Sequence, residues 1–212
     1  MHDSEEPNRR ARGRMRVEKI LDAADSMLRE RTEIDVSLQE VAARAALPPA
    51  SLYHYFSNSH ALMLELAKRY VAAFELLAQE EVDHARLGAW QDLIHLHCER
   101  ALRFYHDHPV AMRLFLGPET GWQIRSADIA ANRRIGRIQY ERLLAHFVVA
   151  DSATLAAAFP VSMTIGDAVW ALSFARHGEV TPEMAAESLR ARLAYLRLYI
   201  GEFAEKRALV RR

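Results

Sequence analysis

Apolar residues recur every three or four positions along most of the chain, which is the spacing of amphipathic helices. The first run includes Val17, Ile20, Ala24 and Leu28 and predicts a helix of about four turns. No segment shows the strict alternation of a half-buried β-strand. Between Gly and Pro breaks, further helices are expected over residues 49–55, 89–108, 109–116, 125–149, 153–176 and 182–207. The pattern therefore predicts an all-α fold.

Start signals define a pair of short helices near residue 40. Ser37 and Glu40 have the spacing of a capping box, and the helix that follows should end near residues 46–47. Pro48 and Pro49 cannot continue that helix, but proline suits the first turn of the next one. Residues 57–59, Ser-Asn-Ser, offer caps for a longer third helix. Two short helices joined by a tight turn indicate a helix-turn-helix, whose second helix fits a DNA major groove.

Composition places the chain among ordinary globular proteins: 212 residues, 50% hydrophobic and 26% charged. A single cysteine excludes a disulfide framework and suits a reducing cytoplasm, where we expect the protein to be. The longest apolar stretch, 152–175, is interrupted by Pro160 and Asp167, and no signal peptide is recognisable, so we expect no membrane partner. The 28 basic and 28 acidic residues balance, which would normally argue against a nucleic-acid partner.

The charge is unevenly distributed, however. Six basic residues lie between Arg9 and Lys19 and only one acidic residue, Glu18, which gives a local sum of +5. Residues 1–13 lack apolar periodicity, and we interpret them as a flexible, Arg-rich arm. Such an arm can be merely solvated, but its position directly before the helix-turn-helix favours DNA contact, with Arg14 and Arg16 as candidates.

Residues 20–62 resemble the N-terminal domain of TetR-family transcriptional regulators. The similar segments are 20–24 (ILDAA), 36–42 (VSLQEVA), 47–56 (LPPASLYHYF) and Leu62. The most specific part is Ser51-Leu52-Tyr53-His54-Tyr55-Phe56, which is similar to the (T/S)-L-Y-x-(H/Y)-F signature of the family's recognition helix. The resemblance implies a helix-turn-helix DNA-binding domain over residues 14–60 and a helical ligand-binding and dimerisation domain over residues 61–212.

The resemblance also implies residue roles. The position of Tyr53 usually contacts a phosphate, and Ser37 resembles a hydroxyl that meets phosphate, although it can be a plain cap. Leu52 and Phe56, four residues apart, should face the core. For Tyr53 and Tyr55, half-buried packing is the alternative. The candidate DNA-contacting residues are Arg14, Arg16, Ser37, Pro49, Ala50, Ser51, Tyr53, His54 and Tyr55.

The chain departs from the family pattern at four positions. Ala46 replaces a glycine in the turn, so the backbone there should avoid positive φ or be modestly strained. Thr32 also stands where glycine is common, Pro49 occupies a frequently basic position, and Ser59 stands where a lysine normally binds phosphate. Residues 37–60 therefore contain only two charged side chains, Glu40 and Arg44. We expect the Arg-rich arm to supply the missing phosphate contacts.

The last two predicted helices indicate self-association. Residues 153–176 are apolar all round, with Asp167 as the only charged residue before Arg176. A helix without a polar face needs partners on every side, and a homodimer with a four-helix bundle supplies them, as the resemblance also implies. A monomeric core is the alternative. In a dimer, recognition helices about 34 Å apart would meet successive major grooves of a palindromic operator in double-stranded DNA.

A ligand cavity is expected beside residues 89–108. His97 lies on the apolar face of that predicted helix and His95 on the opposite face. His97 can be a satisfied core residue or a polar anchor for a ligand, and a buried Asp167 needs a partner from the protein or from a ligand. The candidate residues for a small apolar or aromatic effector are His97, Tyr105, Met112, Phe115, Trp122, Asp167 and Trp170.

Catalytic and metal chemistry have no recognisable pattern in the sequence. His95 and His97, like His106 and His108, are two residues apart and point away from each other on a helix. We therefore expect no metal, no cofactor and no enzymatic activity, but a homodimeric DNA-binding repressor released by an effector. The alternatives are a regulator without an effector, and a helical enzyme or interaction module that carries a decayed motif.

Overall fold

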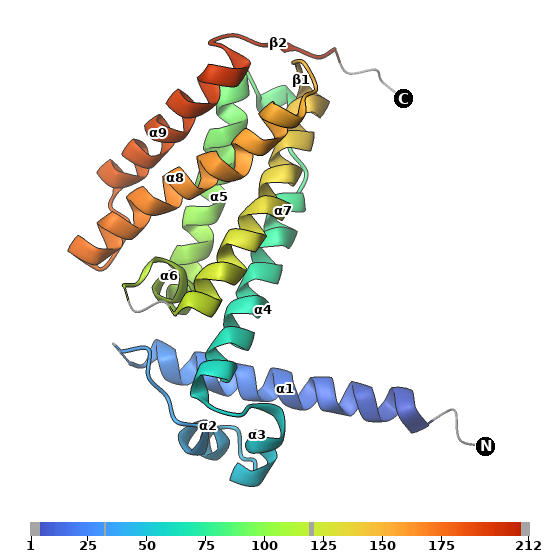
Figure 1. Ribbon diagram of the computed structural model, residues 1–212, viewed down its shortest axis with the longest axis vertical. Helices are drawn as coiled ribbons and strands as arrows, with labels where there is room; N and C mark the ends of the chain where they lie inside the picture. The colour runs from blue at the N-terminus through green and yellow to red at the C-terminus, as the bar shows by residue number, and fades with distance from the viewer. Residues whose placement is uncertain (1–4, 32, 119–120, 209–212) are drawn as a thin grey trace. The chain divides into compact units, whose positions relative to one another are not determined.

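The computed structural model describes residues 5–31, 33–118 and 121–208, with side chains from residue 11 onward. Within these ranges the chain is almost entirely helical, as predicted (Figure 1). It divides into two compact units, the first ending at Arg69 and the second beginning at Tyr70. Helix α4 (Ser59–Gln79) contributes to both units, so the first unit extends nine residues beyond the boundary expected at residue 60.

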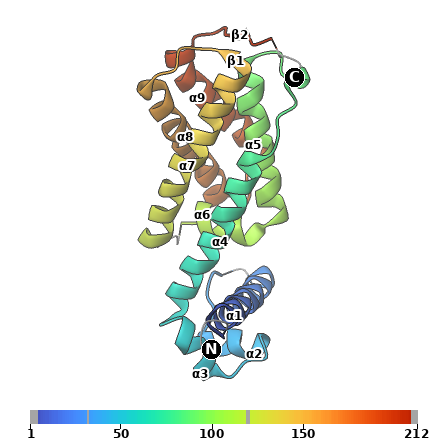
Figure 2. The same cartoon turned by 90° about the vertical axis from the view of Figure 1, so that its right-hand side faces the viewer.

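The first unit contains α1 (Glu5–Arg29), α2 (Leu38–Arg44), α3 (Pro49–Tyr55) and the start of α4. Leu52 and Phe56 are buried, as predicted, and so are Ile20, Ala24 and Val41. The other large apolar side chains of this core are Leu21, Met27, Leu28, Val36, Leu38, Leu62, Met63 and Leu66. This small core holds α2 and α3 in a helix-turn-helix (Figure 2).

The N-terminal boundary of α1 corrects the expectation of a flexible arm. Residues 5–13 are helical, while residues 1–4 lie outside the described part of the chain. The absence of apolar periodicity was misleading, because extending a helix that the core already holds requires no new nucleation. Arg, Glu and Ala favour that extension, and Pro7 is tolerated because it lies in the first turn.

The turn after α2 explains how alanine replaces the family's glycine. Ala46 adopts φ = +51°, in the left-handed region. The amide of Leu47 donates to the carbonyl of Ala42 at 3.0 Å, and the amide of Ala46 donates to the carbonyl of Ala43 at 3.1 Å. These bonds form a Schellman motif, which requires a left-handed residue at this position. Ala46 therefore carries the modest strain that was one of the two expected outcomes. Thr32, another departure, lies outside the described residues.

The second unit is a helical bundle. It contains the remainder of α4, a short 3-10 helix η1 (His84–Arg86), and α5 (Trp90–Asp107), α6 (Pro109–Leu116), α7 (Trp122–His146), α8 (Ala153–His177) and α9 (Pro182–Ile200). Each of α5 to α8 begins and ends within three residues of the predicted limits. Helix α8 packs against both α7 and α9 (Figure 1).

The C-terminal segment differs from prediction. Helix α9 was expected to reach residue 207, but it ends at Ile200, because Gly201 adopts φ = +84° and its amide donates to the carbonyl of Arg197. Beyond it, β2 (Glu205–Lys206) pairs antiparallel with β1 (Phe147–Val148), so Phe147 faces Lys206. The expectation that the chain lacks strands is therefore wrong for these four residues.

Two glycines allow close helix packing in this unit. A Cβ atom on Gly136 of α7 would lie 2.8 Å from the backbone nitrogen of Pro160 in α8. A Cβ atom on Gly166 of α8 would lie 2.8 Å from Cδ of Arg192 and 2.9 Å from Oγ of Ser188, both in α9. Small residues at these crossings let α8 approach both neighbours, and this brings polar side chains of three helices together in the bundle interior.

Candidate functional site

Helix α3 presents most of its side chains to solvent. Pro49, Ala50 and His54 are exposed, and 54% of Tyr53 is accessible. Ser51 and Tyr55 are half-buried, so packing explains part of their environment. All six candidate residues on α3 therefore lie on or beside the surface that the buried Leu52 leaves uncovered.

Local sequence accounts for the limits of α3. Pro48 at the N-cap is extended, with φ = −60° and ψ = 137°, and its carbonyl accepts from the amide of Ser51 at 2.9 Å. The helix ends at Phe56, whose amide donates to the carbonyl of Leu52 at 2.8 Å before the backbone becomes extended. The two prolines and the buried Phe56 thus fix a helix of seven residues.

Ser37 is exposed and caps α2, as the sequence predicted. Its Oγ accepts from the amide of Glu40 at 3.2 Å, and the Glu40 carboxylate accepts from the amide of Ser37 at 2.9 Å. Arg31 also donates to Glu40 at 2.6 Å. The Arg31 guanidinium and the two Ser37 bonds lower the pKa of Glu40 to about 2, so this carboxylate is ionised at neutral pH.

Basic side chains near the helix-turn-helix are paired with carboxylates. Arg44 reaches Glu30 at 2.6 Å, and Arg69 reaches Asp22 at 2.6 Å. Arg29 similarly contacts Asp25 at 2.9 Å. The recognition surface is therefore bordered by cations whose charge is already largely balanced.

The N-terminal half of α1 is different. Arg12, Arg14, Arg16 and Lys19 are exposed, and none of them forms an ion pair with the side chains described here. Arg12, Arg16 and Lys19 follow one another at helical spacing, so they share one face of α1. The available positive charge of this unit is thus concentrated on one helix, and of these four residues only Arg12 lies in the range, 1–13, where the sequence suggested a flexible arm.

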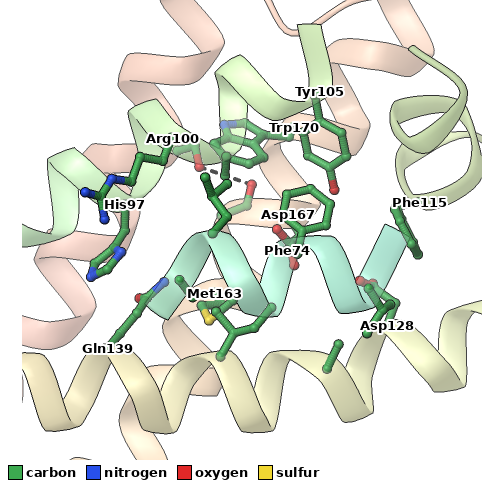
Figure 3. Close-up of a pocket in the computed structure, with 18 of the residues that line it drawn as sticks. Phe74, His97, Arg100, Tyr105, Phe115, Asp128, Gln139, Met163, Asp167 and Trp170 are labelled. Atoms are coloured by element: carbon green, nitrogen blue, oxygen red, sulfur yellow. Dashed lines mark hydrogen bonds between the residues drawn. The ribbon is translucent and has the colours of Figure 1, made fainter. Parts of the chain in front are cut away.

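The second unit contains a cavity of about 70 Å³ among helices α4 to α9 (Figure 3). Its wall includes five of the seven residues predicted to bind a ligand: His97, Tyr105, Phe115, Asp167 and Trp170. Met112 is not part of the wall. Trp122 also lies elsewhere, because it is the first residue of α7 and is 77% exposed. The structure therefore does not bring these two residues to the cavity.

Several wall residues were missed by sequence reasoning, notably Phe74, Asp128, Gln139 and Arg192. Arg192 did leave a signal, because it is a charged residue three positions after Leu189 and four before Leu196, within the apolar stripe of α9. Asp128 left none, since α7 is rich in polar residues along its whole length. Only the packing of α7 against its neighbours shows which of them face inward.

Arg192 joins four helices from inside the bundle. Its Nε donates to Oγ of Ser162 at 3.2 Å, and its two terminal nitrogens donate to Sγ of Cys98 and Oε1 of Gln139, each at 3.0 Å. The residue is buried, with 5% of its surface accessible. All three guanidinium nitrogens are therefore used within the protein.

His97 is buried beside the cavity, and its Nε2 has no hydrogen-bond partner in the protein. Burial and the nearby positive charges of Arg192, Arg100 and Arg142 lower the pKa of His97 to about 3. The imidazole is therefore neutral at physiological pH and offers a hydrogen bond without a charge. The predicted placement of His97 on the apolar face is confirmed, and that of His95 on the opposite face as well.

Two carboxylates share the cavity wall. Oδ2 of Asp167 accepts from Nδ2 of Asn132 at 2.7 Å, so Asp167 has a protein partner. Burial raises the pKa of Asp167, although the Asn132 bond and Arg192 oppose this shift. Burial, reinforced by the charge of Asp167, raises the pKa of Asp128 to about 7, against the effect of Arg125. The cavity thus holds acidic groups that are costly to ionise.

Helices α8 and α9 also carry exposed apolar side chains. Val161, Leu172, Leu198 and Tyr199 are the large ones, and Phe203 just beyond α9 is 91% exposed. Helix α8 is long and apolar enough to cross a membrane by length and composition alone, a test that core helices of globular proteins also pass. Among the side chains described, no group of three or more His, Cys, Asp or Glu is arranged to hold a metal ion.

Comparison with known proteins agrees with this architecture. Residues 20–66 match the family described as "Bacterial regulatory proteins, tetR family", and residues 88–200, more than half of the chain, match the "Tetracyclin repressor-like, C-terminal domain". No curated protein matches the chain significantly.

Solved structures share the fold. A TetR-family transcriptional regulator from Streptomyces coelicolor has a TM-score of 0.65 at 20% identity and covers 87% of this chain and 99% of its own. A TetR transcriptional regulator from Rhodococcus sp. RHA1 has a TM-score of 0.65 at 18% sequence identity and covers 87% of this chain and 97% of its own. Thermus thermophilus FadR, a TetR-family repressor in complex with lauroyl-CoA, has a TM-score of 0.54 at 20% sequence identity and covers 92% of this chain and 98% of its own.

These matches confirm the predicted all-α fold with an N-terminal helix-turn-helix and a C-terminal helical domain. The signature on α3, the capped α2 and the helical bundle that follows are all accounted for by one family. The chain belongs to the TetR family of bacterial transcriptional regulators.

Proposed function

We propose that the protein is a homodimeric repressor that binds palindromic double-stranded DNA and leaves it when a small effector enters the cavity of the second unit. One observation carries the DNA-binding part: α3 exposes Tyr53 and His54 while Leu52 is buried beneath them. A short helix that packs one face against the core and exposes the other face to solvent is suited to enter a major groove. Pro49, Ala50, Ser51 and His54 are then the candidates for contacts with base edges.

Phosphate contacts come from two sources in this proposal. Tyr53 and Tyr55 offer hydroxyl groups, and Ser37 lies at the N-terminus of α2, although its hydroxyl is already engaged with Glu40. Arg12, Arg14, Arg16 and Lys19 offer charges that no described carboxylate neutralises. Because Arg31, Arg44 and Arg69 are paired within the protein, α1 supplies most of the electrostatic attraction.

The cavity supports the effector part of the proposal. FadR from Thermus thermophilus, which shares the fold, is a repressor found with lauroyl-CoA. At about 70 Å³ the present cavity is smaller than the roughly 150 Å³ that admits benzene in an engineered protein. A ring-sized effector would therefore favour a state with a wider cavity. A tenfold effect on DNA affinity requires about 1.4 kcal/mol of differential affinity between the two states.

The exposed apolar side chains of α8 and α9 support a homodimer. A second copy would cover Val161, Leu172 and Leu198 in a four-helix bundle, a closed arrangement that leaves no apolar face in water. A two-fold axis would place two α3 helices for successive major grooves of a palindrome, about 34 Å apart. We propose that this dimer acts in the cytoplasm, where Cys98 stays reduced.

A gel-shift titration with the protein's own upstream DNA over a series of salt concentrations tests the DNA-binding proposal. Binding should weaken with salt, with a log–log slope of roughly −0.9 for each phosphate neutralised. Removing residues 1–15 should weaken binding more than His54→Ala does, because the cations on α1 act on every sequence. The absence of salt-sensitive binding to any duplex would contradict the proposal and favour a helical module with a decayed motif.

Thermal unfolding with a panel of small molecules tests the effector part separately. A molecule that binds the native state raises the melting temperature. If DNA binding is present but no small molecule ever raises the melting temperature, the protein is a regulator without an effector.

A further inference from the structure

Two carboxylates in the cavity wall have weak partners for their charge. Asp167 of α8 is half-buried and accepts from the neutral amide of Asn132 at 2.7 Å. Asp128 of α7 is 15% exposed, and its cation is Arg125, one turn earlier on the same helix at 3.1 Å. The Arg125 side chain is one third exposed. The negative charge inside the cavity is therefore compensated by Arg125 at its edge and by the nearby charge of Arg192, whose hydrogen bonds go to other residues.

The basic side chains of the wall are fully engaged, in contrast. Arg192 uses all three nitrogens on Ser162, Cys98 and Gln139. Arg100 donates to the carbonyl oxygens of Glu80 at 3.3 Å and Glu81 at 2.8 Å. An anionic ligand would have to compete with these bonds, whereas a cation would meet carboxylates that need one.

Aromatic rings surround the acidic part of the cavity (Figure 3). Phe74 contacts Tyr105 with ring centroids 5.1 Å apart and Phe115 at 6.2 Å, and Tyr105 contacts Trp170 at 6.0 Å. Aromatic faces attract cations through their quadrupole, most strongly where water is excluded. Like the carboxylates, the faces of these four rings would attract a positively charged ligand.

An unused hydrogen-bonding group lies toward the other end of the cavity. Nε2 of the buried His97 has no partner in the protein, although His97 lines the same wall (Figure 3). Nε1 of Trp170, also in the wall, is likewise without one. Buried polar groups are normally satisfied, so these atoms are consistent with a site that a ligand completes.

We propose that the cavity binds a small organic cation, whose ammonium group is held by the carboxylates of Asp128 and Asp167 and by the aromatic rings beside them. The proposal rests on the proposed function, because this cation would be the effector. At about 70 Å³ the cavity is smaller than the space such a molecule needs, so the cation, like a ring-sized effector, would favour a state with a wider cavity. His97 would accept or donate a hydrogen bond at the uncharged end of that molecule.

Three compounds of nearly equal shape test the charge requirement. Choline is a permanent cation, 3,3-dimethylbutan-1-ol is its neutral analogue, and 3,3-dimethylbutanoate is an anion of the same size. In calorimetric titrations at pH 8, choline should bind at least tenfold more tightly than the alcohol, and the carboxylate should bind most weakly. Equal or tighter binding of the alcohol or the carboxylate overturns the proposal, and so does failure of choline to bind.

The pH dependence identifies the carboxylate. Burial and the charge of Asp167 raise the pKa of Asp128 to about 7, so Asp128 is mostly protonated at pH 6 and mostly ionised at pH 8. Choline does not titrate in this range. Its affinity should therefore fall about tenfold from pH 8 to pH 6, while that of the alcohol stays constant. A pH-independent affinity for choline contradicts the assignment to Asp128.

Matched variants complete the test. Asp128→Asn keeps the size of the side chain and should lose at least tenfold in choline affinity at pH 8, but retain the affinity of the alcohol, which shows that the cavity is intact. Glu99→Gln removes an exposed carboxylate of α5 and should leave choline binding unchanged. Unchanged choline binding in Asp128→Asn overturns the proposal.

Duplex binding by the same preparations separates the two levels of inference. Intact duplex binding without selectivity for choline refutes the cation and leaves the DNA-binding proposal standing. Selective choline binding without duplex binding refutes the proposed repressor and supports the cation site.

Discussion

The ionisable side chains beside the helix-turn-helix of the first unit and those of the cavity in the second unit lie in opposite environments. In the first unit they lie at the surface and pair with one another, so the pKa of Glu40 is lowered to about 2 by Arg31 and Ser37. In the second unit they lie inside a cavity, where burial raises the pKa of Asp128 to about 7 and lowers that of His97 to about 3. Surface pairing leaves a recognition surface with little net charge, whereas burial leaves groups that a ligand can complete.

The largest expected effect is on the free energy of unfolding, when a buried arginine of the second unit is removed and compared with a surface arginine of the first unit. Arg192→Ala should lower the free energy of unfolding by about 3 kcal/mol or more, because buried Gln139 and Ser162 lose a charged donor and a cavity forms. Arg44→Ala should change it little, because its ion pair with Glu30 is exposed to water. Urea unfolding followed by far-UV circular dichroism measures both. Similar losses in the two variants would contradict the comparison.

The pH dependence of stability is the next test. An aspartate with an ordinary pKa of 3.8 and a folded pKa of about 7 binds a proton on folding between these values. Its contribution to stability is therefore lost as pH rises from about 4 to 7. Asp128→Asn removes this loss, so its unfolding free energy relative to the parent should rise with pH, by at least about 1.4 kcal/mol, the value of one pKa unit. Denaturant unfolding of both proteins at pH 5 and pH 8 measures the difference between their unfolding free energies. If this difference is the same at both pH values, burial does not raise the pKa of Asp128.

The third test concerns the cations of α1. Replacing Arg12, Arg14, Arg16 and Lys19 by alanine should weaken duplex binding about tenfold or more at moderate salt, and should reduce the log–log salt slope by roughly 0.9 for each phosphate that is no longer neutralised. Arg86→Ala removes an exposed positive charge from the second unit and is the matched control. Fluorescence anisotropy with a labelled duplex gives both quantities. If Arg44→Ala lowers the salt slope as much, the paired cations also act on DNA.

The smallest effect is expected at the turn of the helix-turn-helix. Ala46 has φ = +51°, and glycine adopts this conformation without strain. Ala46→Gly should therefore raise the unfolding free energy by about 0.5–1 kcal/mol, since the gain in the folded state exceeds the entropy that glycine adds to the unfolded chain. Thermal unfolding measures the change. Ala45→Gly, at the neighbouring right-handed C-cap, should destabilise and serves as the control.

The N-terminal half of α1 shows why one prediction failed. Apolar periodicity correctly placed the core-facing residues from Ile20 to Leu28, since a helix that packs against a core must repeat its apolar side. Residues 5–13 lack that repeat, yet they are helical because α1 continues from the part that the core already holds. Periodicity reports packing, and it is silent about helix that extends into solvent.

Sequence patterns also predicted only part of the cavity wall. His97, Tyr105 and Asp167 were predicted from unusual residues on apolar faces, and they do line it. Trp122 was predicted from its type alone and lies in solvent. Asp128 and Gln139 gave no signal, because α7 is polar throughout and its sequence does not state which side meets α8.

By itself, the sequence determined the features that depend on residues a few positions apart: the helices, the capping box of Ser37 and Glu40, and the signature of α3. The tertiary structure alone decided which charges are paired or buried, where the cavity lies, and how α9 ends before β2 pairs with β1. The physical reason is distance along the chain. Helix periodicity and capping are local, whereas burial, ion pairing between helices and strand pairing depend on segments brought together only by folding.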